Sequence, residues 1–488
     1  MNNNTENIKV NEMSTIAPVK KPVKKPEAEI LLDRQLEMGK TARGTDIALV
    51  AAFCAIVLAL GILFWAIPDK AYSESEKRSL KQLPEMSVQR VIDDAVRDLK
   101  MMTMTETEKK AYREELAKDG RDLVFSDEIG EYFADQFPFR DELRVLKAVC
   151  EIGMLKLENN DILFTFDGSL VKKDTVTGQT KNEDGTYRDR NYSDACANID
   201  QNVKYISVME NFISKTDIKL LSAVAGRSID VRKDSLPGVF PYGSTHADDY
   251  WAAYANAVEQ YNIKGNIPLR DMLADKVTEG EYVYYKTDHH WTTLGAYYAY
   301  CAIIEGYGIE PLPLESFERE VFSDEFLGTT YASAGAALGG KDTIEFFRFE
   351  GDTDYTMTIP TGDEITVIDG FYNYKYQSVM DKYSAFLGHD NMTENGGNNP
   401  ITYITKNNAE GREKMIVIKD SFGHSLAPFL AYHFDLIILD MRYYNGDMSE
   451  YYSDPLVTHM LIIYNMETFM NDSNLSRAAG NTVMYFNK

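Results

Sequence analysis

From residue 198 to the C-terminus, helical patterns alternate with short apolar runs, and this alternation constrains the fold more than any other feature of the sequence. The apolar runs lie at residues 218–224, 415–418, 436–439 and 460–464. Runs of this kind are typical of strands buried on both faces of a parallel sheet. Because parallel strands need crossover connections, the alternation predicts an α/β domain whose parallel sheet carries helices on both faces.

The expected helices and remaining strand complete this pattern. Helices are predicted at residues 201–215, 248–261 and 293–307, and another begins near residue 425. A further strand is expected near residues 281–285. Residues 320–400 are rich in glycine, aspartate and tyrosine, which predicts an insertion of loops and short strands beside the site.

Two polar clusters follow expected strands and together carry the groups needed for nucleophilic acyl transfer. The first is Thr287-Asp288-His289-His290-Trp291, and the second is Lys419-Asp420-Ser421-Phe422-Gly423. A serine, a histidine that takes its proton and an aspartate that orients the histidine form such a catalytic group. The residues alone do not decide between His289 and His290 as the base. In a parallel sheet, both clusters would lie beyond the carboxyl ends of strands, where sites form.

Less specific interpretations of the same residues stay open. Asp420 and Ser421 are also good caps for the helix that follows. Ser425 is a competing nucleophile, although its place inside that helix favours packing. Asp288 and the two histidines are metal-ligand types, but neighbouring histidines do not easily share one ion and no further ligand motif is present. We therefore expect no metal and no cofactor.

Four other side chains are candidate substrate contacts. They are His289, Trp291, His424 and Arg442. The alternative for the tryptophan is core packing, and the alternative for the arginine is a structural ion pair.

Composition excludes some classes of protein. The formal net charge is −25, which argues against nucleic acid as a partner because phosphate binding needs a basic face. The four cysteines have no metal-ligand spacing and suggest no disulfide framework. They are Cys54, Cys150, Cys196 and Cys301.

Residues 47–67 form a run of 21 residues without a charge. That length crosses a bilayer, whereas the apolar part of a signal peptide is shorter. We predict a retained single-span anchor, with cleavage after Ala71-Tyr72-Ser73 as the alternative. Basic residues flank the run on both sides, so they do not decide its orientation. The predicted organisation is a disordered cytoplasmic tail (1–46), the anchor (47–67), a helical stalk with a small β-rich element (68–195) and the α/β domain (196–488).

Two segments resemble a known family. KTDHHWTTLGAY at residues 286–297 resembles the signature of the bacterial DHHW family, and KDSFGHSLAPFL at residues 419–430 resembles its serine block. LDMRYY at residues 439–444 is also similar. The family is similar to SGNH-like extracytoplasmic proteins that O-acetylate alginate and other surface polysaccharides. The resemblance implies a three-layer SGNH-like domain in which the D-x-H element precedes the serine block, a permuted order.

The resemblance also implies roles and partners. Ser421 would be the nucleophile, His290 the base and Asp288 its orienter. The acetyl donor would be a membrane-bound O-acyltransferase, the acceptor a polysaccharide, and the domain would lie outside the cell on a single-pass anchor in the plasma membrane. The expected function is O-acetyl transfer to a surface polysaccharide, or acetylesterase action, through an acetyl-serine intermediate. The alternative from another class is a non-catalytic surface protein that binds glycan or organises an export complex.

Overall fold

The computed structural model describes residues 26–487 apart from 77, 86, 106–107, 110–111, 113–115, 117–124, 178, 182–186, 190–191, 233–246, 363 and 391–398. The chain divides into two compact units, Met1–Pro68 and Asp69–Lys488. The four clusters of buried hydrophobic side chains all lie in the second unit, which therefore carries its own core.

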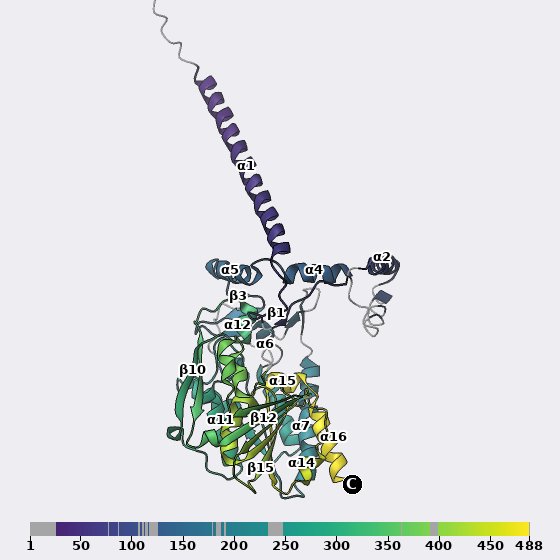
Figure 1. The fold of residues 1–488 in the computed structure, drawn as a ribbon, viewed down its shortest axis with the longest axis vertical. Helices are drawn as coiled ribbons and strands as arrows, with labels where there is room; N and C mark the ends of the chain where they lie inside the picture. The colour runs from purple at the N-terminus through teal and green to yellow at the C-terminus, as the bar shows by residue number, and fades with distance from the viewer. Residues whose placement is uncertain are drawn as a thin grey trace, which may run out of the picture. The chain divides into compact units, whose positions relative to one another are not determined.

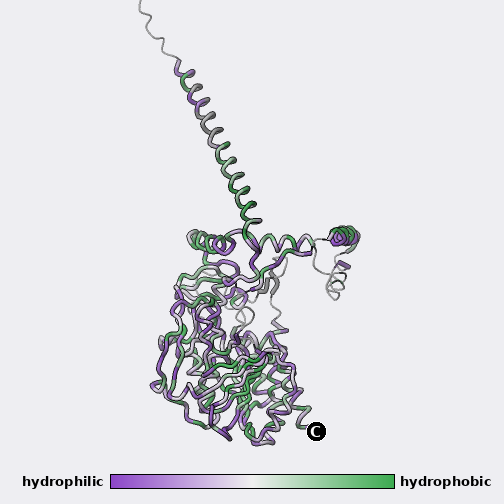
Figure 2. The backbone as a smooth tube through the Cα atoms, in the orientation of Figure 1, coloured by the Kyte–Doolittle hydropathy of each residue, from purple (hydrophilic) through white to green (hydrophobic). Residues whose placement is uncertain are grey.

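The first unit contains one long helix, α1 (Glu27–Ala66). Its part from Thr45 to Ala66 has a mean hydropathy of 3.0, so by length and composition it could cross a membrane or serve as a signal sequence. Figure 2 shows this part as a continuous hydrophobic stretch. The helix begins at Glu27, so residues 27–46, expected to be disordered, are helical here. Residues 1–25 of the predicted tail lie outside the described residues.

An eight-stranded mixed sheet forms the centre of the second unit (Figure 1). Its order is β13-β12-β14-β16-β15-β17-β8-β9. The parallel part consists of β8 (Lys219–Ala225), β9 (Asn266–Pro268), β15 (Lys414–Lys419), β16 (Asp435–Leu439) and β17 (Val457–Asn465). All of these except the short edge strand β9 were predicted. Three antiparallel strands extend one edge: β12 (Tyr355–Thr361), β13 (Glu364–Asp369) and β14 (Ile401–Lys406).

Alternate residues of the parallel strands enter two different cores, as expected for strands buried on both faces. In β15, Met415 and Val417 belong to one cluster, and Ile416 and Ile418 belong to the other. Helices α11 (Thr293–Gly306) and α13 (Gly423–His433) cover the first face. Helices α7 (Tyr192–Ile213), α9 (Ala247–Gln260), α15 (Met466–Asn471) and α16 (Leu475–Phe486) cover the second. The predicted three-layer α/β fold is confirmed.

Shorter elements surround the sheet. They are α8 (Ser228–Val231), α10 (Arg270–Thr278), α12 (Thr329–Ala334), α14 (Ser449–Ser453) and the pair β10 (Glu318–Phe326) and β11 (Asp342–Arg348). Three 3₁₀ turns, η3 (Asp352–Asp354), η4 (Tyr374–Ser378) and η5 (Lys382–Phe386), lie in the predicted insertion, and η2 (Leu314–Ser316) precedes it. The insertion is therefore richer in strands than expected, because β12 and β13 join the main sheet. Its residues 391–398 lie outside the described part.

The prediction of a strand near residues 281–285 is wrong. The structure has an isolated bridge between Tyr284 and Trp291 there. The segment instead folds back on its own loop: Val283 O accepts from Thr292 N (2.9 Å), and Tyr285 N donates to His290 O (3.2 Å).

Residues 69–191 carry helices and small sheets. The helices are α2 (Val88–Met102), α4 (Phe125–Asp135), α5 (Arg140–Gly153) and α6 (Lys173–Thr177). The strands are β1 (Tyr72–Ser73), β2 (Arg78–Ser79), β3 (Glu158–Asn159), β4 (Ile162–Phe164), β5 (Leu170–Lys172), β6 (Gln179–Lys181) and β7 (Tyr187–Asp189). The predicted domain boundary at residue 195 stays a prediction; α7 begins just before it.

Candidate active site

The turn between β15 and α13 presents Ser421. Asp420 caps this turn: its Oδ1 accepts from Phe422 N (2.9 Å), and its Oδ2 accepts from Asn465 N at the end of β17 (2.7 Å). Ser421 does not cap the helix with its side chain. Its Oγ instead lies 2.7 Å from His290 Nε2. Asp420 thus orders the turn before α13, and the helix has no side-chain cap from either residue.

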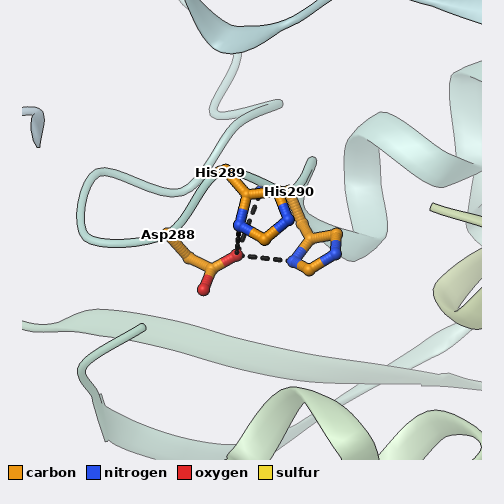
Figure 3. Close-up of side chains that lie close together, drawn as sticks. All are labelled: Asp288, His289 and His290. Atoms are coloured by element: carbon orange, nitrogen blue, oxygen red, sulfur yellow. Dashed lines mark hydrogen bonds and ion pairs between the residues drawn. The ribbon is translucent and has the colours of Figure 1, made fainter. Parts of the chain in front are cut away.

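Asp288 and His290 lie on the loop before α11 and face each other (Figure 3). Asp288 Oδ1 lies 2.5 Å from His290 Nδ1 and also accepts from the His290 backbone N–H (3.0 Å). These contacts fit one tautomer, in which Nδ1–H donates to the carboxylate and Nε2 accepts from the Ser421 hydroxyl. Asp288 is 1% exposed and His290 5%, whereas Ser421 is partly exposed. The structure therefore brings the three predicted catalytic residues into one chain of hydrogen bonds.

Thr329 holds the other oxygen of Asp288, and the sequence did not single it out. Asp288 Oδ2 accepts from Thr329 N (2.6 Å) and Thr329 Oγ1 (2.9 Å) at the start of α12. The preceding residue is Gly328, and a Cβ there would lie 2.2 Å from Asp288 Cβ. Glycine is therefore needed for this close approach. Thr329 lies 41 residues after Asp288 in a region expected to be loops, so its role depends on tertiary contacts that no local pattern reveals.

A second carboxylate fixes the loop that carries Asp288. Asp342, at the start of β11, accepts from Lys286 N (2.9 Å), Thr287 N (2.7 Å) and Thr287 Oγ1 (2.6 Å). Three donors on consecutive residues hold the backbone in one conformation. This residue was also missed, because it lies 55 residues from the motif it supports.

Tyr383, in η5, packs flat against the imidazole of His290. The ring centroids are 4.0 Å apart and the planes differ by 11°. Its hydroxyl contacts Ser421 O (3.2 Å) and Ser425 Oγ (3.1 Å). Burial raises the pKa of Tyr383 well above its ordinary value, so the hydroxyl stays neutral. Tyr383 covers one face of the histidine ring.

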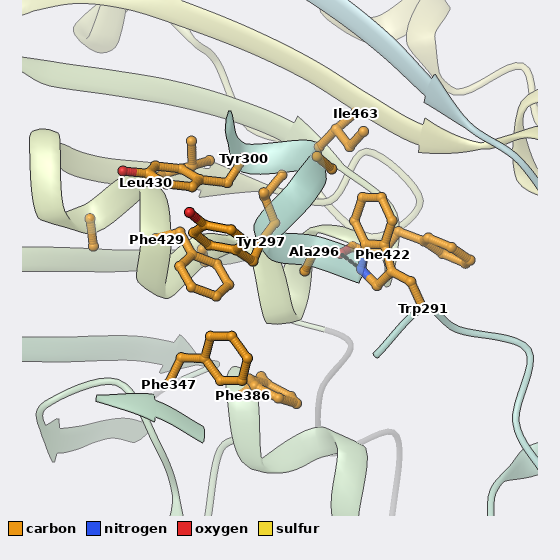
Figure 4. Close-up of a cluster of buried hydrophobic side chains, with 14 of the residues drawn as sticks. Trp291, Ala296, Tyr297, Tyr300, Phe347, Phe386, Phe422, Phe429, Leu430 and Ile463 are labelled. Carbon is orange, nitrogen blue, oxygen red and sulfur yellow. Dashed lines mark hydrogen bonds between the residues drawn. The ribbon is translucent and has the colours of Figure 1, made fainter. Parts of the chain in front are cut away.

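Trp291 packs inside the core beneath the site (Figure 4), and Ser425 is buried as well. Trp291 is fully buried, and its Nε1–H donates to Phe422 O (3.1 Å) and Ser425 Oγ (3.0 Å). A sugar cannot stack on a ring without exposed surface, so the prediction of Trp291 as a substrate contact is wrong and the packing alternative fits. Ser425 is equally buried and its Oγ contacts Trp291 Nε1 and Tyr383 Oη, which fits packing rather than nucleophilic attack.

His424 and Arg442 belong to a charged cluster below the turn. Lys419 Nζ lies 2.9 Å from His424 Nε2 and 3.1 Å from Asp440 Oδ2, and Arg442 Nη2 donates to Asp440 Oδ2 (2.7 Å). Burial, with the Lys419 charge, lowers the pKa of His424 well below its ordinary value and keeps the ring neutral. Burial opposes ionisation of Asp440, but the two cations outweigh it and lower its pKa.

This cluster decides two of the predicted substrate contacts. His424 is 2% exposed and therefore does not meet a substrate at the surface, so that prediction is wrong. The guanidinium of Arg442 binds Asp440 through both Nε (2.9 Å) and Nη2, which is the structural ion pair given as the alternative.

His289 is the predicted substrate contact whose position suits that role. Its side chain is 41% exposed, and its Nδ1 lies 2.7 Å from Thr329 Oγ1. It lines a cavity of about 60 Å³ with polar residues at or just beyond the ends of β8 and β17, among them Arg227, Asn465 and Glu467. A sugar-sized pocket needs several hundred Å³, so this cavity is at most the inner end of a substrate groove.

The ligand atoms of Asp288, His289 and His290 lie within 4.8 Å of one another and could hold a metal ion. His290 Nδ1 and both oxygens of Asp288 already have hydrogen-bond partners. An ion bound by all three residues would have to displace these bonds.

Comparisons with known proteins agree with this architecture. Residues 185–329 match the family model described as SGNH hydrolase-like domain, acetyltransferase AlgX. Residues 265–439 match the family model described as DHHW protein. A search of curated proteins finds no match.

Similar solved structures include a DHHW family protein from Eubacterium siraeum, with 24% identity, 57% of this chain and 88% of that chain covered, and a TM-score of 0.44. PatB1 from Bacillus cereus is 19% identical, with 64% and 98% covered and a TM-score of 0.48. The O-acetyltransferase domain of Pseudomonas putida AlgJ is 13% identical, with 66% and 98% covered and a TM-score of 0.38.

The fold and the family match define an α/β protein of the SGNH hydrolase-like class. Within that class, the segment that carries Asp288, His290 and Ser421 matches the DHHW family, so the resemblance seen in the two motifs is confirmed.

Proposed function

We propose that this protein is a serine-dependent O-acyltransferase that acetylates a cell-surface polysaccharide. The observation that carries the proposal is the hydrogen-bonded series from Asp288 through His290 to Ser421, with heavy-atom distances of 2.5 and 2.7 Å. The match to an SGNH hydrolase-like acetyltransferase model supports the same class of chemistry. Water as the acceptor would make the enzyme an acetylesterase by the same steps.

The first half-reaction forms an acetyl-serine. His290 Nε2 takes the proton of Ser421 as Oγ attacks the acetyl carbonyl carbon, and Asp288 stabilises the imidazolium that results. The bond between the carbonyl carbon and the donor's leaving oxygen then breaks, and His290 returns the proton to that oxygen. In the second half-reaction, His290 takes a proton from a sugar hydroxyl, whose oxygen attacks the acetyl carbon. The bond between that carbon and Ser421 Oγ then breaks, and His290 gives the proton to Oγ.

Two backbone N–H groups of the turn already have acceptors within it and are not available to an oxyanion. Phe422 N donates to Asp420 Oδ1 (2.9 Å) and Gly423 N donates to Asp420 O (3.1 Å), so both are committed to the turn. The Ser421 N–H would therefore be the turn's donor to the oxyanion that forms on the acetyl carbonyl. His289, beside the cavity next to the triad, would contact the acceptor.

The proposed location is the outer face of the plasma membrane, with the segment Thr45–Ala66 as the anchor. The acetyl donor would be a membrane-bound O-acyltransferase partner. These two assignments extend the family resemblance, and they place the acyl donor and the anchored enzyme in the same membrane.

The test uses the unit Asp69–Lys488, which carries its own core. Release of acetate from a chromogenic acetyl ester and covalent labelling by a sulfonyl fluoride would be measured for wild type, Ser421→Ala, His290→Ala and Ser425→Ala, with and without a chelator. We expect Ser421→Ala and His290→Ala to abolish hydrolysis, Ser425→Ala to retain it, and the label to map to Ser421.

Other outcomes would overturn the proposal. Hydrolysis that survives Ser421→Ala would remove the serine from the mechanism, and loss of activity on chelation would favour a metal at Asp288, His289 and His290. Absence of both hydrolysis and labelling in the folded wild type would favour the non-catalytic glycan-binding alternative.

A further inference from the structure

Helix α2 exposes its apolar side and directs its polar side toward the protein. Its apolar residues fall on one face and are 49–80% exposed: Val88, Val91, Ile92, Val96, Leu99 and Met102. On the opposite face, Arg97 is buried, and Arg90 binds Glu128 of α4 (2.6 Å). A surface helix of a water-soluble protein has the reverse arrangement.

Helix α5 has the same inverted arrangement. Leu146 and Val149 are 56% and 55% exposed. Its opposite face binds the protein through charges: Arg144 Nη2 donates to Ala332 O of α12 (2.9 Å), and Lys147 Nζ donates to Asn159 Oδ1 of β3 (3.0 Å). Two helices of one unit therefore present apolar side chains that the described part of the chain leaves exposed.

Aromatic and aliphatic side chains at the ends of α5 extend its apolar surface. Phe137 and Phe139 precede the helix and are 40% and 53% exposed, and Met154 and Leu155 follow it at 72% and 85%. Phe139 has a φ of 58°, a left-handed conformation that is uncommon for a bulky side chain. A backbone held in this conformation with its ring exposed is a pattern associated with function.

Chain connectivity relates this surface to the candidate membrane segment. Asp69 accepts a hydrogen bond from Tyr132 Oη of α4 (3.1 Å), and Lys70 N donates to Gln136 Oε1 just after α4 (2.9 Å). Asp69 is the third residue after the end of the apolar segment at Ala66. Since each residue spans at most about 3.6 Å, a bilayer holding that segment would end within about 11 Å of Asp69.

We propose that the exposed apolar faces of α2 and α5, with Phe137 and Phe139, insert into the interfacial region of a lipid bilayer. Amphipathic helices with aromatic and aliphatic apolar faces bind bilayers in this way. Each helix carries three basic and three acidic residues, and the whole chain is acidic, so apolar insertion rather than attraction to anionic lipid drives binding. This proposal depends on the proposed membrane location but not on the acyl-transfer chemistry.

The test measures partition of Asp69–Lys488, which lacks the apolar segment, into phosphatidylcholine vesicles by co-sedimentation. We expect binding that persists in about 0.5 M salt, where attraction between surface charges is largely screened. Phosphatidylserine should not increase it, because neither helix has a net charge. The double variant Leu99→Glu with Leu146→Glu should lower partition at least about tenfold, since it removes two large side chains from the lipid.

The matched control is Ile365→Glu, which changes a side chain of similar exposure (65%) on the edge strand β13. It should bind as wild type, and retained circular dichroism and thermal unfolding would show that all variants are folded. Equal partition of the double variant and wild type would refute the proposal. Failure of the folded wild type to bind vesicles would also refute it. If the wild type were then found to be a dimer and the double variant a monomer, the apolar faces would be assigned to contact with a second copy of the chain. Neither readout involves Ser421 or the anchor, so failure here is distinct from failure of the proposed function.

Discussion

Asp288→Asn is the substitution that tests the site most directly, because four donors surround this carboxylate. Oδ1 accepts from His290 N and contacts Nδ1, and Oδ2 accepts from Thr329 N and Oγ1. A carboxylate can accept all four hydrogen bonds, whereas an amide has one oxygen and one donor group. Either orientation of the introduced amide therefore places an NH₂ group against a backbone N–H.

The two orientations differ in their effect on His290. With the amide oxygen toward His290, the tautomer is kept but Thr329 N loses its acceptor. With the NH₂ group toward His290, Nδ1 must accept, so Nε2 carries the proton and can no longer take one from Ser421. Each leaves a buried donor unsatisfied, at about 1–3 kcal/mol, and both remove the negative charge that stabilises the imidazolium. In serine proteases the same change lowers kcat by about 10⁴.

We expect hydrolysis of the acetyl ester and sulfonylation of Ser421 both to fall by about 10³–10⁴, or roughly 4–5.5 kcal/mol in activation free energy. Urea unfolding would report a loss of about 1–3 kcal/mol in stability. Asp352→Asn is the control, because Asp352 is also buried and paired, with Arg348, but lies in η3 outside the site. Activity of Asp288→Asn within about tenfold of wild type would show that Asp288 does not orient the base.

Three further predictions follow from the same contacts. Thr329→Val removes the hydroxyl bond to Asp288 and keeps the backbone bond, so we expect kcat to fall about tenfold with the pH profile unchanged; equal activity would show that the backbone donor is sufficient. Tyr383→Phe keeps the ring against His290 and removes its hydroxyl contacts. The free energy of unfolding should therefore fall by about 1 kcal/mol, while activity changes less than about threefold. A larger loss of activity would give the hydroxyl a role in the reaction. Burial lowers the pKa of His459 from 6.5 to about 4, so between these pH values the unfolded chain binds a proton that the folded chain excludes. The free energy of unfolding should therefore fall by up to about 3 kcal/mol as the pH drops from about 6.5 to about 4. Urea unfolding of His459→Gln should show a weaker pH dependence, and an equal one would show that this residue is not the cause.

The parallel part of the sheet and the reacting residues were predictable because their signals are local. Apolar runs mark the strands β8, β15, β16 and β17, and strand ends mark where Ser421 would lie. The antiparallel edge was not predictable, since β12 and β13 lie in a segment whose glycine and aspartate content suggests loops. β12 joins the sheet by pairing with β14, which is distant in sequence, and β13 joins it through β12.

The residues that support the catalytic loop could not be predicted from local sequence patterns either. Thr329, Asp342 and Tyr383 carry no motif of their own, and each acts on the catalytic loop from a different part of the fold. The roles of Trp291 and His424 were misjudged for the opposite reason. Their proximity to the motifs suggested contact with substrate, but sequence position does not reveal that both side chains point into the core.

Helix α12 connects two parts of the molecule that have been described separately. Thr329, its first residue, holds Asp288, and the carbonyl of Ala332, one turn later, accepts from Arg144 of α5. If α5 rests on lipid, little more than a helix diameter, about 10 Å, separates the headgroups from the part of the structure that orients the catalytic base. The site would then be able to act only on groups that lie close to the bilayer surface. If the protein is the O-acyltransferase proposed above, we expect it to modify glycan as the polymer emerges at the membrane surface, and to leave chains already incorporated further out untouched.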